Sequence, residues 1–179
     1  MNCTWCAAPM TKRRGASTCS TRCRVAKSRV AFPDAMTSVD RWIRHRAKVP
    51  LTVRNYGASS TNPATWSTFD RAKDSGVGDG LGFVLNGDGI ACIDLDHCIT
   101  DGVLAPGAQS IVDQCRGTYI EVSLSGTGLH IFGYANVGSG RNLGGVEVYD
   151  RGRYIAVTGR RWRRAPLELF DISVVVNSL

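Results

Sequence analysis

Two aspartates stand two residues apart at the end of an apolar run, in the stretch GIACIDLDHC at residues 89–98. The apolar run predicts a buried strand, and because side chains alternate across a strand, Asp94 and Asp96 would share a face, about 6–7 Å apart. Two carboxylates so placed repel one another and lose hydration unless a cation lies between them. A divalent ion of the Mg²⁺ or Mn²⁺ type fits this requirement. Taken alone, the pair fits equally well a strand end whose acids are simply solvated.

Two further stretches carry residues suited to the same chemistry. In SGTGLHIF, Ser125, Gly126 and Gly128 form a predicted tight turn whose backbone N–H groups can approach a phosphate, and His130 begins the strand that follows. In GVEVYD, Glu147 alternates with apolar valines and therefore leaves the core face. If these strands share one sheet with the aspartates, the acids and the histidine converge, which fits two-metal phosphoryl transfer. The other interpretation of His130 is a core histidine with its hydrogen bonds satisfied.

Hydrophobic periodicity and turn residues predict an α+β domain, in which helices pack on one side of a mostly antiparallel sheet. Three β-hairpins are expected around glycine-containing turns: residues 80–86 with 90–96, 118–124 with 129–134, and 145–150 with 154–159. Helices are expected at residues 38–48, 64–73 and 106–116. Trp66 and Phe69 would lie on one face of the second helix as core anchors.

Four of the seven cysteines lie within the first 23 residues, as two close pairs separated by twelve residues. Two thiolate pairs on short turns can close a tetrahedral zinc site, which leaves no open coordination position for catalysis. Zinc would supply the folding free energy of this segment, because its apolar content is low. The expected structural zinc ligands are Cys3, Cys6, Cys19 and Cys23. The alternative is free thiols in a disordered tail. The remaining cysteines are expected to be buried thiols: Cys92, Cys98 and Cys115.

Positive charge is concentrated in two parts of the chain. Residues 1–50 hold eleven Lys or Arg against two acids, and residues 151–164 hold six arginines and no acid, within a total charge of +7. Such basic regions favour a polyanionic partner, most commonly nucleic acid, and the alternative is charge that serves only solubility. Since no apolar span or signal-peptide core appears, we expect a cytoplasmic protein with no membrane partner. The expected organisation is a zinc module at 1–30, a linker at 31–37 and a main domain at 38–179.

The stretches IDLDHC, SGTGLHIF and VEVYDRGRYIAVTG, in this order and spacing, resemble the primase-polymerase branch of the archaeo-eukaryotic primase superfamily, particularly its phage and plasmid replication proteins. The resemblance covers about residues 40–162. It implies the primase catalytic core as the fold. It also places Asp94 and Asp96 on the first catalytic motif, His130 on the second and Glu147 on the third.

The resemblance further implies template-directed nucleotidyl transfer that makes primers in DNA replication, in the host cytoplasm if the chain is phage-encoded. The three motif acids would hold Mg²⁺ or Mn²⁺, and His130 with the Ser125 turn would contact the nucleotide phosphates. Arg153 would reach phosphate or template, although a solvated arginine is the equal alternative. The implied partners are a single-stranded DNA template, gripped by the zinc module, and nucleoside triphosphates.

Three features depart from the family pattern. The third-motif acid is Glu147 rather than the Asp of many relatives, and Asp150 is close enough to take its role. The chain ends about twenty residues after VTG, and no Walker phosphate loop appears. The chain would then be a stand-alone catalytic subunit, one half of a split primase or a fragment, and we expect a separate helicase or a second primase subunit as a partner. Two other functions stay open: a catalytically silent zinc-knuckle accessory protein that binds nucleic acid, and a metal-dependent nuclease.

Overall fold

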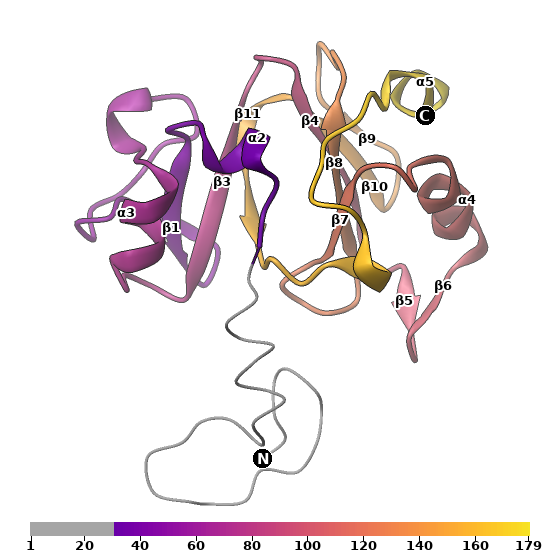
Figure 1. Cartoon of the computed structure of the whole chain (residues 1–179), viewed down its shortest axis with the longest axis horizontal. Helices are drawn as coiled ribbons and strands as arrows, with labels where there is room; N and C mark the ends of the chain where they lie inside the picture. Colours follow the sequence, from indigo (N-terminus) through magenta and orange to yellow (C-terminus); the bar gives the residue numbers. More distant parts are fainter. Residues whose placement is uncertain (1–30) are drawn as a thin grey trace, which may run out of the picture. The chain divides into compact units, whose positions relative to one another are not determined.

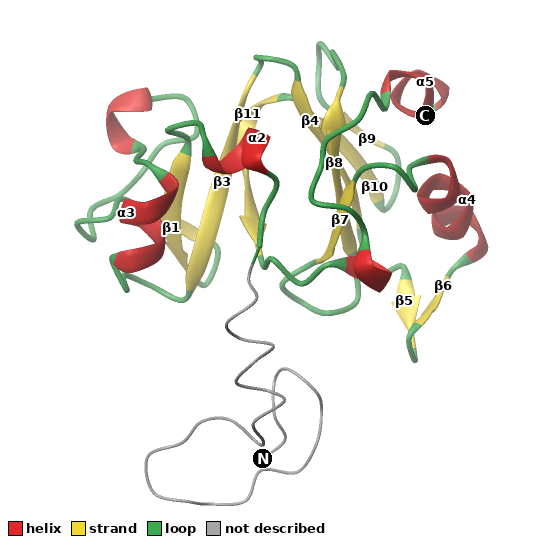
Figure 2. Ribbon diagram, in the orientation of Figure 1, coloured by secondary structure: helices red, strands yellow, loops and turns green. Residues whose placement is uncertain are grey.

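The expected α+β class is confirmed in the computed structural model, which describes residues 31–179. Two antiparallel sheets form its frame, and short helices pack beside them (Figures 1 and 2). The expected zinc module at residues 1–30 lies outside the described residues. Within the described part, no helix is long and apolar enough to cross a membrane.

One sheet has four antiparallel strands in the order β11 (Arg151–Val157), β3 (Gly80–Asn86), β1 (Trp42–Arg46) and β2 (Val49–Leu51). The chain turns from β1 into β2 through Ala47 and Lys48, which both have positive φ. Two helices lie between β2 and β3 along the chain: η1 (Pro63–Thr65) and α3 (Phe69–Asp74). The Thr68 hydroxyl accepts the Arg71 backbone N–H and so caps the start of α3.

The other large sheet has five antiparallel strands in the order β7 (Tyr119–Val122), β8 (Leu129–Tyr134), β4 (Ile90–Leu95), β10 (Val146–Tyr149) and β9 (Arg141–Asn142). A small separate hairpin follows β4, made of β5 (Ile99–Thr100) and β6 (Val103–Leu104). The remaining helices of the folded unit are α2 (Asp34–Thr37), α4 (Pro106–Gln114), η2 (Trp162–Arg164) and α5 (Ser173–Ser178). The expected helix at 106–116 is thus confirmed as α4, with Pro106 at its first position.

Two of the three expected hairpins are wrong. Strands β3 and β4 follow one another through a tight turn but belong to different sheets, and so do β10 and β11. The chain therefore passes from one sheet to the other at the β3–β4 turn and again at the β10–β11 turn. A hydrogen bond joins these two turns, because the Gly87 backbone N–H donates to the Asp150 carbonyl oxygen at 2.7 Å. Turn residues predict a chain reversal, whereas the partner of a strand depends on long-range packing. Only the expected β7–β8 hairpin is confirmed.

The expected helix at 38–48 is also wrong, because residues 42–46 form the buried strand β1. Pairing with a strand on each side outweighs the weak helical spacing of a few apolar residues. The next expected helix begins later than predicted, at Phe69, so Trp66 lies before it rather than on its face. Within the expected linker, α2 forms and the side chains of Phe32 and Met36 are buried, so these residues belong to the folded unit.

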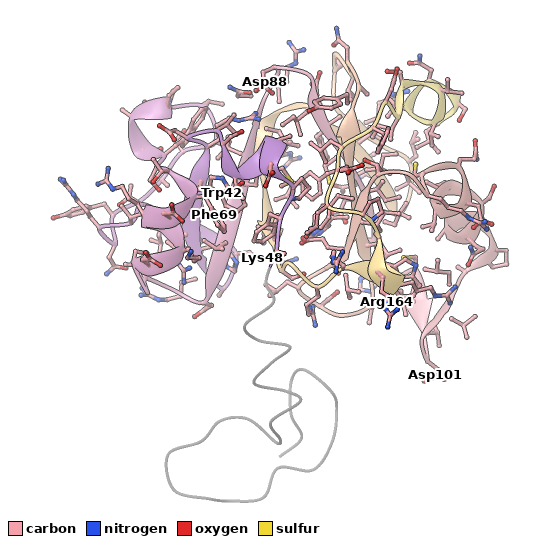
Figure 3. The ribbon with its side chains drawn as sticks, viewed as in Figure 1. Trp42, Lys48, Phe69, Asp88, Asp101 and Arg164 are labelled. Carbon is pink, nitrogen blue, oxygen red and sulfur yellow. The ribbon has the colours of Figure 1, made fainter. Side chains whose placement is uncertain are left out.

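Two apolar cores lie on opposite faces of the five-stranded sheet. One is aromatic and joins this sheet to the four-stranded sheet, with the Phe83 and Phe132 ring centroids 6.2 Å apart. Trp42 packs in the same core, 4.8 Å from the ring of Phe69 (Figure 3). The other core joins the sheet to α4 and α5. His130 lies two residues before Phe132 on β8 and therefore on the same face of the sheet. The aromatic core on this face thus ends beside a polar side chain.

Candidate active site

A row of polar side chains crosses the five-stranded sheet beside the aromatic core. In the strand register Glu121 is opposite His130, His130 opposite Asp94, Asp94 opposite Glu147, and Glu147 opposite Asn142. Directly opposed residues of antiparallel strands point to the same face, with Cβ atoms about 4.5–5.5 Å apart. The structure therefore brings together Asp94, His130 and Glu147, three of the sequence-predicted site residues, on one sheet.

His130 is held from one side by a carboxylate that solvent does not reach. Its Nδ1 lies 2.9 Å from Glu121 Oε1, and Glu121 is 0% exposed. Glu121 also accepts hydrogen bonds from the Tyr119 hydroxyl at 2.8 Å and from the backbone N–H groups of Thr158 and Gly159 at 3.1 and 2.8 Å. Burial alone lowers the pKa of His130, but the hydrogen bond and charge of Glu121 outweigh it and raise that pKa. The imidazole is thereby fixed with Nδ1 toward Glu121.

Asp94 stands in the middle of the row with one oxygen unpartnered. Its Oδ1 is buried without a hydrogen-bond partner and lies 3.7 Å from His130 Nε2. Burial raises the pKa of Asp94; His130 opposes this effect, while Asp96 and Glu147 add to it. His130 offsets part of the charge of Asp94 at this distance, but Oδ1 still accepts no hydrogen bond and can accept a further cation or a proton donor. This oxygen therefore marks a position suited to a metal ion.

A cavity of about 240 Å³ opens in front of Asp94 and His130. Asp96, the first residue after β4, is exposed and also lines it. The other walls come from the β1–β2 turn, the residues after β7, and β11: Lys48, Ser123, Leu124, Ser125, Tyr154, Ile155 and Ala156. The Tyr154 hydroxyl donates to the Lys48 carbonyl oxygen and so fixes the turn that carries this lysine. Carboxylates, an imidazole, hydroxyls and an ammonium in one cavity suit a ligand that bears phosphates and a metal.

The Ser125 turn reaches this cavity through hydroxyl groups. Ser123 and Ser125 both line it, with their Oγ atoms 3.0 Å apart. The Gly126 backbone N–H donates to the Ser123 carbonyl oxygen at 3.1 Å, and the Gly128 N–H to Ser123 Oγ at 3.1 Å. These two expected phosphate-binding amides are therefore used within the turn. Gly128 is required, because a Cβ there would lie 2.6 Å from the Leu95 carbonyl oxygen.

The two acids considered for the third motif lie in different surroundings. Glu147 stands in the polar row directly opposite Asp94. Asp150 is 2% exposed, and its carboxylate accepts hydrogen bonds from Arg151 at 2.9 Å and from the Val137 backbone N–H at 3.0 Å. The strand register thus favours Glu147 as the acid beside Asp94, since Asp150 is engaged elsewhere.

Arg153 is not among the residues that line the cavity. Its guanidinium lies 4.7 Å over the ring of Tyr149, and its Nη2 donates to the Tyr149 hydroxyl at 3.3 Å. Tyr149 shares a sheet face with Glu147, two residues away. Arg153 therefore contacts Tyr149, which lies beside Glu147 of the polar row. Its contact with phosphate or template stays a prediction.

Asp94 and Asp96 fit a divalent ion that takes few ligands from the protein. Among residues 31–179, no group of three or more His, Cys, Asp and Glu side chains is already arranged as a metal site. Mg²⁺ commonly takes one or two carboxylates and completes its octahedral shell with water and substrate phosphates. The unpartnered Oδ1 of Asp94 and the exposed carboxylate of Asp96 match that pattern, with Glu147 next in the row.

The structure describes the three cysteines expected to be buried thiols but not the four expected to bind zinc. The expected zinc ligands lie outside the described residues, so zinc binding stays a prediction: Cys3, Cys6, Cys19 and Cys23. The other three are free and buried, as expected: Cys92, Cys98 and Cys115. Burial raises the pKa of the Cys115 thiol to about 11, so this group is an inert part of the core.

Sequence reasoning missed Glu121 and Lys48. An acid within the apolar strand stretch YIEV is itself a signal, since a buried carboxylate requires partners. Lys48 offers no such signal, because it reaches the cavity only through the β1–β2 turn, in a segment predicted to be helical. Its position depends on the fold of the four-stranded sheet.

Comparison with known proteins agrees with the family that the three motifs resemble. No family model matches the chain. The chain is similar to the DNA primase-polymerase of Nitratiruptor phage NrS-1, with 32% identity over 155 residues. The similarity covers 75% of this chain, which spans 21% of the length of that relative. This comparison supports the primase-polymerase family for the chain.

Proposed function

We propose that this chain is a primase-polymerase catalytic domain, which makes primers in phage DNA replication by template-directed nucleotidyl transfer. The observation that carries the proposal is the polar row, where Asp94 stands between His130 and Glu147 and has an unpartnered oxygen. The 32% identity to a phage DNA primase-polymerase supports the same reaction.

In this proposal Asp94 and Asp96 hold Mg²⁺ or Mn²⁺, with Glu147 as the further acid. A bound divalent ion lowers the pKa of the attacking 3′-hydroxyl and neutralises the triphosphate charge. Because the pKa of Asp94 is raised, protons compete with the metal at this carboxylate, and metal affinity falls as the pH decreases.

The other cavity residues bind and orient the nucleotide. Glu121 accepts the Nδ1–H of His130 and favours the charged imidazolium, in which Nε2 is also protonated and donates to a phosphate oxygen in the cavity. The Lys48 ammonium adds a second positive charge. The hydroxyls of Ser123 and Ser125 donate to the remaining phosphate oxygens. These contacts position the triphosphate for attack.

The partners of the domain follow from this reaction. A single-stranded DNA template and nucleoside triphosphates are its substrates, and the four-cysteine module binds structural zinc and grips the template. We propose a separate helicase or a second primase subunit as a further partner. Each of these partners is part of the proposal.

Incubation with single-stranded template, labelled nucleotides and Mg²⁺ or Mn²⁺ tests the proposal. We expect products that lengthen with time and disappear in the double variant Asp94→Ala/Asp96→Ala. Shortening of the template in place of synthesis would identify a nuclease instead. Template binding without any turnover would identify an accessory binding protein.

A further inference from the structure

A second cavity, of about 380 Å³, lies between α4 and the arginine-rich segment that follows β11. It shares no lining residue with the catalytic cavity. Ile120 of β7 lines it, on the sheet face opposite Glu121. We call it the Arg–Trp cavity after its polar and aromatic lining, which consists of Gln109, Asp113, Arg116, Trp162, Arg163 and Arg164.

The charge of the Arg–Trp cavity is positive because its one carboxylate is already neutralised. Asp113 accepts hydrogen bonds from Arg116 Nη2 at 2.8 Å and from Gln109 Nε2 at 2.7 Å. Arg163 and Arg164 are exposed, and within residues 31–179 neither side chain forms an ion pair or donates a hydrogen bond. Two guanidinium groups are therefore available to an anion.

These two arginines are held in a backbone conformation that residues other than glycine rarely adopt. Their φ angles are 41° at Arg163 and 63° at Arg164. The turn is fixed by Arg161 Nη1, which donates to the Ala165 carbonyl oxygen at 3.1 Å. The Arg163 guanidinium lies 4.8 Å over the ring of Trp162. Such conformations cluster at binding sites, and here they create a flat indole–guanidinium surface beside a second cation.

The same segment connects the Arg–Trp cavity to the catalytic cavity. Arg160 donates through Nη2 to the Ser123 carbonyl oxygen, at the wall of the catalytic cavity. The Arg160 carbonyl oxygen accepts the Val122 backbone N–H at 2.8 Å, so the segment follows the edge strand β7. In Figure 3, Lys48 and Arg164 both lie in the lower half of the folded unit, away from Asp88. A single strand that occupies both cavities would pass around the β7 edge.

We propose that the Arg–Trp cavity binds one nucleotide of a single-stranded DNA whose neighbouring part occupies the catalytic cavity. This inference rests on the proposed function, and it adds a contact outside the catalytic cavity. Guanidinium groups bind phosphodiester oxygens in a two-point geometry, and a guanidinium that lies over an aromatic ring, as Arg163 lies over Trp162, offers a flat cationic surface to a base of any sequence. An acidic protein segment would neutralise the arginines but would not use the flat surface of Arg163 on Trp162, so the combination favours nucleic acid.

Binding of labelled oligothymidylate to the full-length chain, measured by fluorescence anisotropy over a series of salt concentrations, tests the inference. The test variant is Arg163→Gln/Arg164→Gln. Its matched control, Arg54→Gln/Arg71→Gln, removes the same charge from exposed positions near the four-stranded sheet. We expect the test variant to bind about tenfold more weakly, with a salt slope lower by about 1.4, or about 0.7 for each lost phosphate contact. The control should bind within about twofold of the wild type.

Equal weakening in the control variant, or unchanged binding in the test variant, would overturn the inference. A titration with thymidine triphosphate alone distinguishes a bound strand from a bound free nucleotide. If the test variant loses as much affinity for thymidine triphosphate as for the oligonucleotide, the cavity binds mononucleotides and the proposed strand contact is wrong. Thermal unfolding checks that both variants stay folded. Primer synthesis by the wild type is measured separately: its absence would refute the proposed function, while the binding difference still decides this cavity.

Discussion

Replacing Glu121 by glutamine asks whether a buried carboxylate holds His130 in its charged form. The carboxylate has no exposure to solvent and accepts hydrogen bonds from four groups: the Tyr119 hydroxyl, His130 Nδ1, and the N–H groups of Thr158 and Gly159. Glutamine has the same shape, but it turns an NH₂ group toward donors and removes the charge. Breaking a buried pair by removing one partner costs about 3–5 kcal/mol. The unfolding midpoint should therefore fall by about 6–20 °C, at about 2–4 °C per kcal/mol.

The cost of Glu121→Gln depends on pH because part of it comes from the charge of His130. The folded-state pKa of His130 is raised above its ordinary value of about 6.5. The stabilisation is therefore complete below about pH 6.5 and is lost as the pH rises through the raised pKa. Thermal unfolding of wild type and variant across this range measures it. The control Tyr119→Phe removes one donor and should cost about 1 kcal/mol at every pH. Equal stability of Glu121→Gln and wild type, or a difference that does not narrow as pH rises, would refute the reasoning.

Three further predictions concern the turn, a buried histidine and zinc. Gly128→Ala should lower the free energy of unfolding by about 1–3 kcal/mol in chemical denaturation, because its Cβ meets the Leu95 carbonyl oxygen, whereas Gly107→Ala, with open space, should not destabilise. Burial lowers the pKa of His45, so the free energy of unfolding should fall as the pH drops below about 6.5. The fall should be smaller in His45→Leu, and the same pH dependence of unfolding in both proteins would contradict this. Metal analysis of freshly purified, unchelated protein should give about one zinc per chain, and its absence would exclude the four-cysteine site: Cys3, Cys6, Cys19 and Cys23.

Features determined by neighbouring residues could be predicted from the sequence. The β7–β8 hairpin and α4 were predicted because each is specified by a local turn or by an apolar face of its own. Alternation along the strands also placed Asp94, His130 and Glu147 on faces that could meet. The ordered motifs indicate a shared site without any knowledge of the strand pairing.

Features determined by long-range pairing could not be predicted. The turn between β3 and β4 contains the residues of a hairpin, yet the two strands pair in different sheets. Strand β1 is a strand because β2 and β3 flank it, not because of its own propensity. For the same reason Lys48 was missed, since its place in the catalytic cavity depends on where the β1–β2 turn lies.

Primer synthesis by Asp94→Asn tests the central claim most directly. The matched control is Asp101→Asn, an exposed aspartate between β5 and β6 whose φ of 51° asparagine also adopts. On a single-stranded template with Mg²⁺ or Mn²⁺, wild type and Asp101→Asn should make lengthening products. Synthesis by Asp94→Asn should fall by at least about a hundredfold, since it loses several kcal/mol of charge stabilisation in the transition state. Synthesis by Asp94→Asn at the wild-type rate would contradict the assignment of the polar row as the active site.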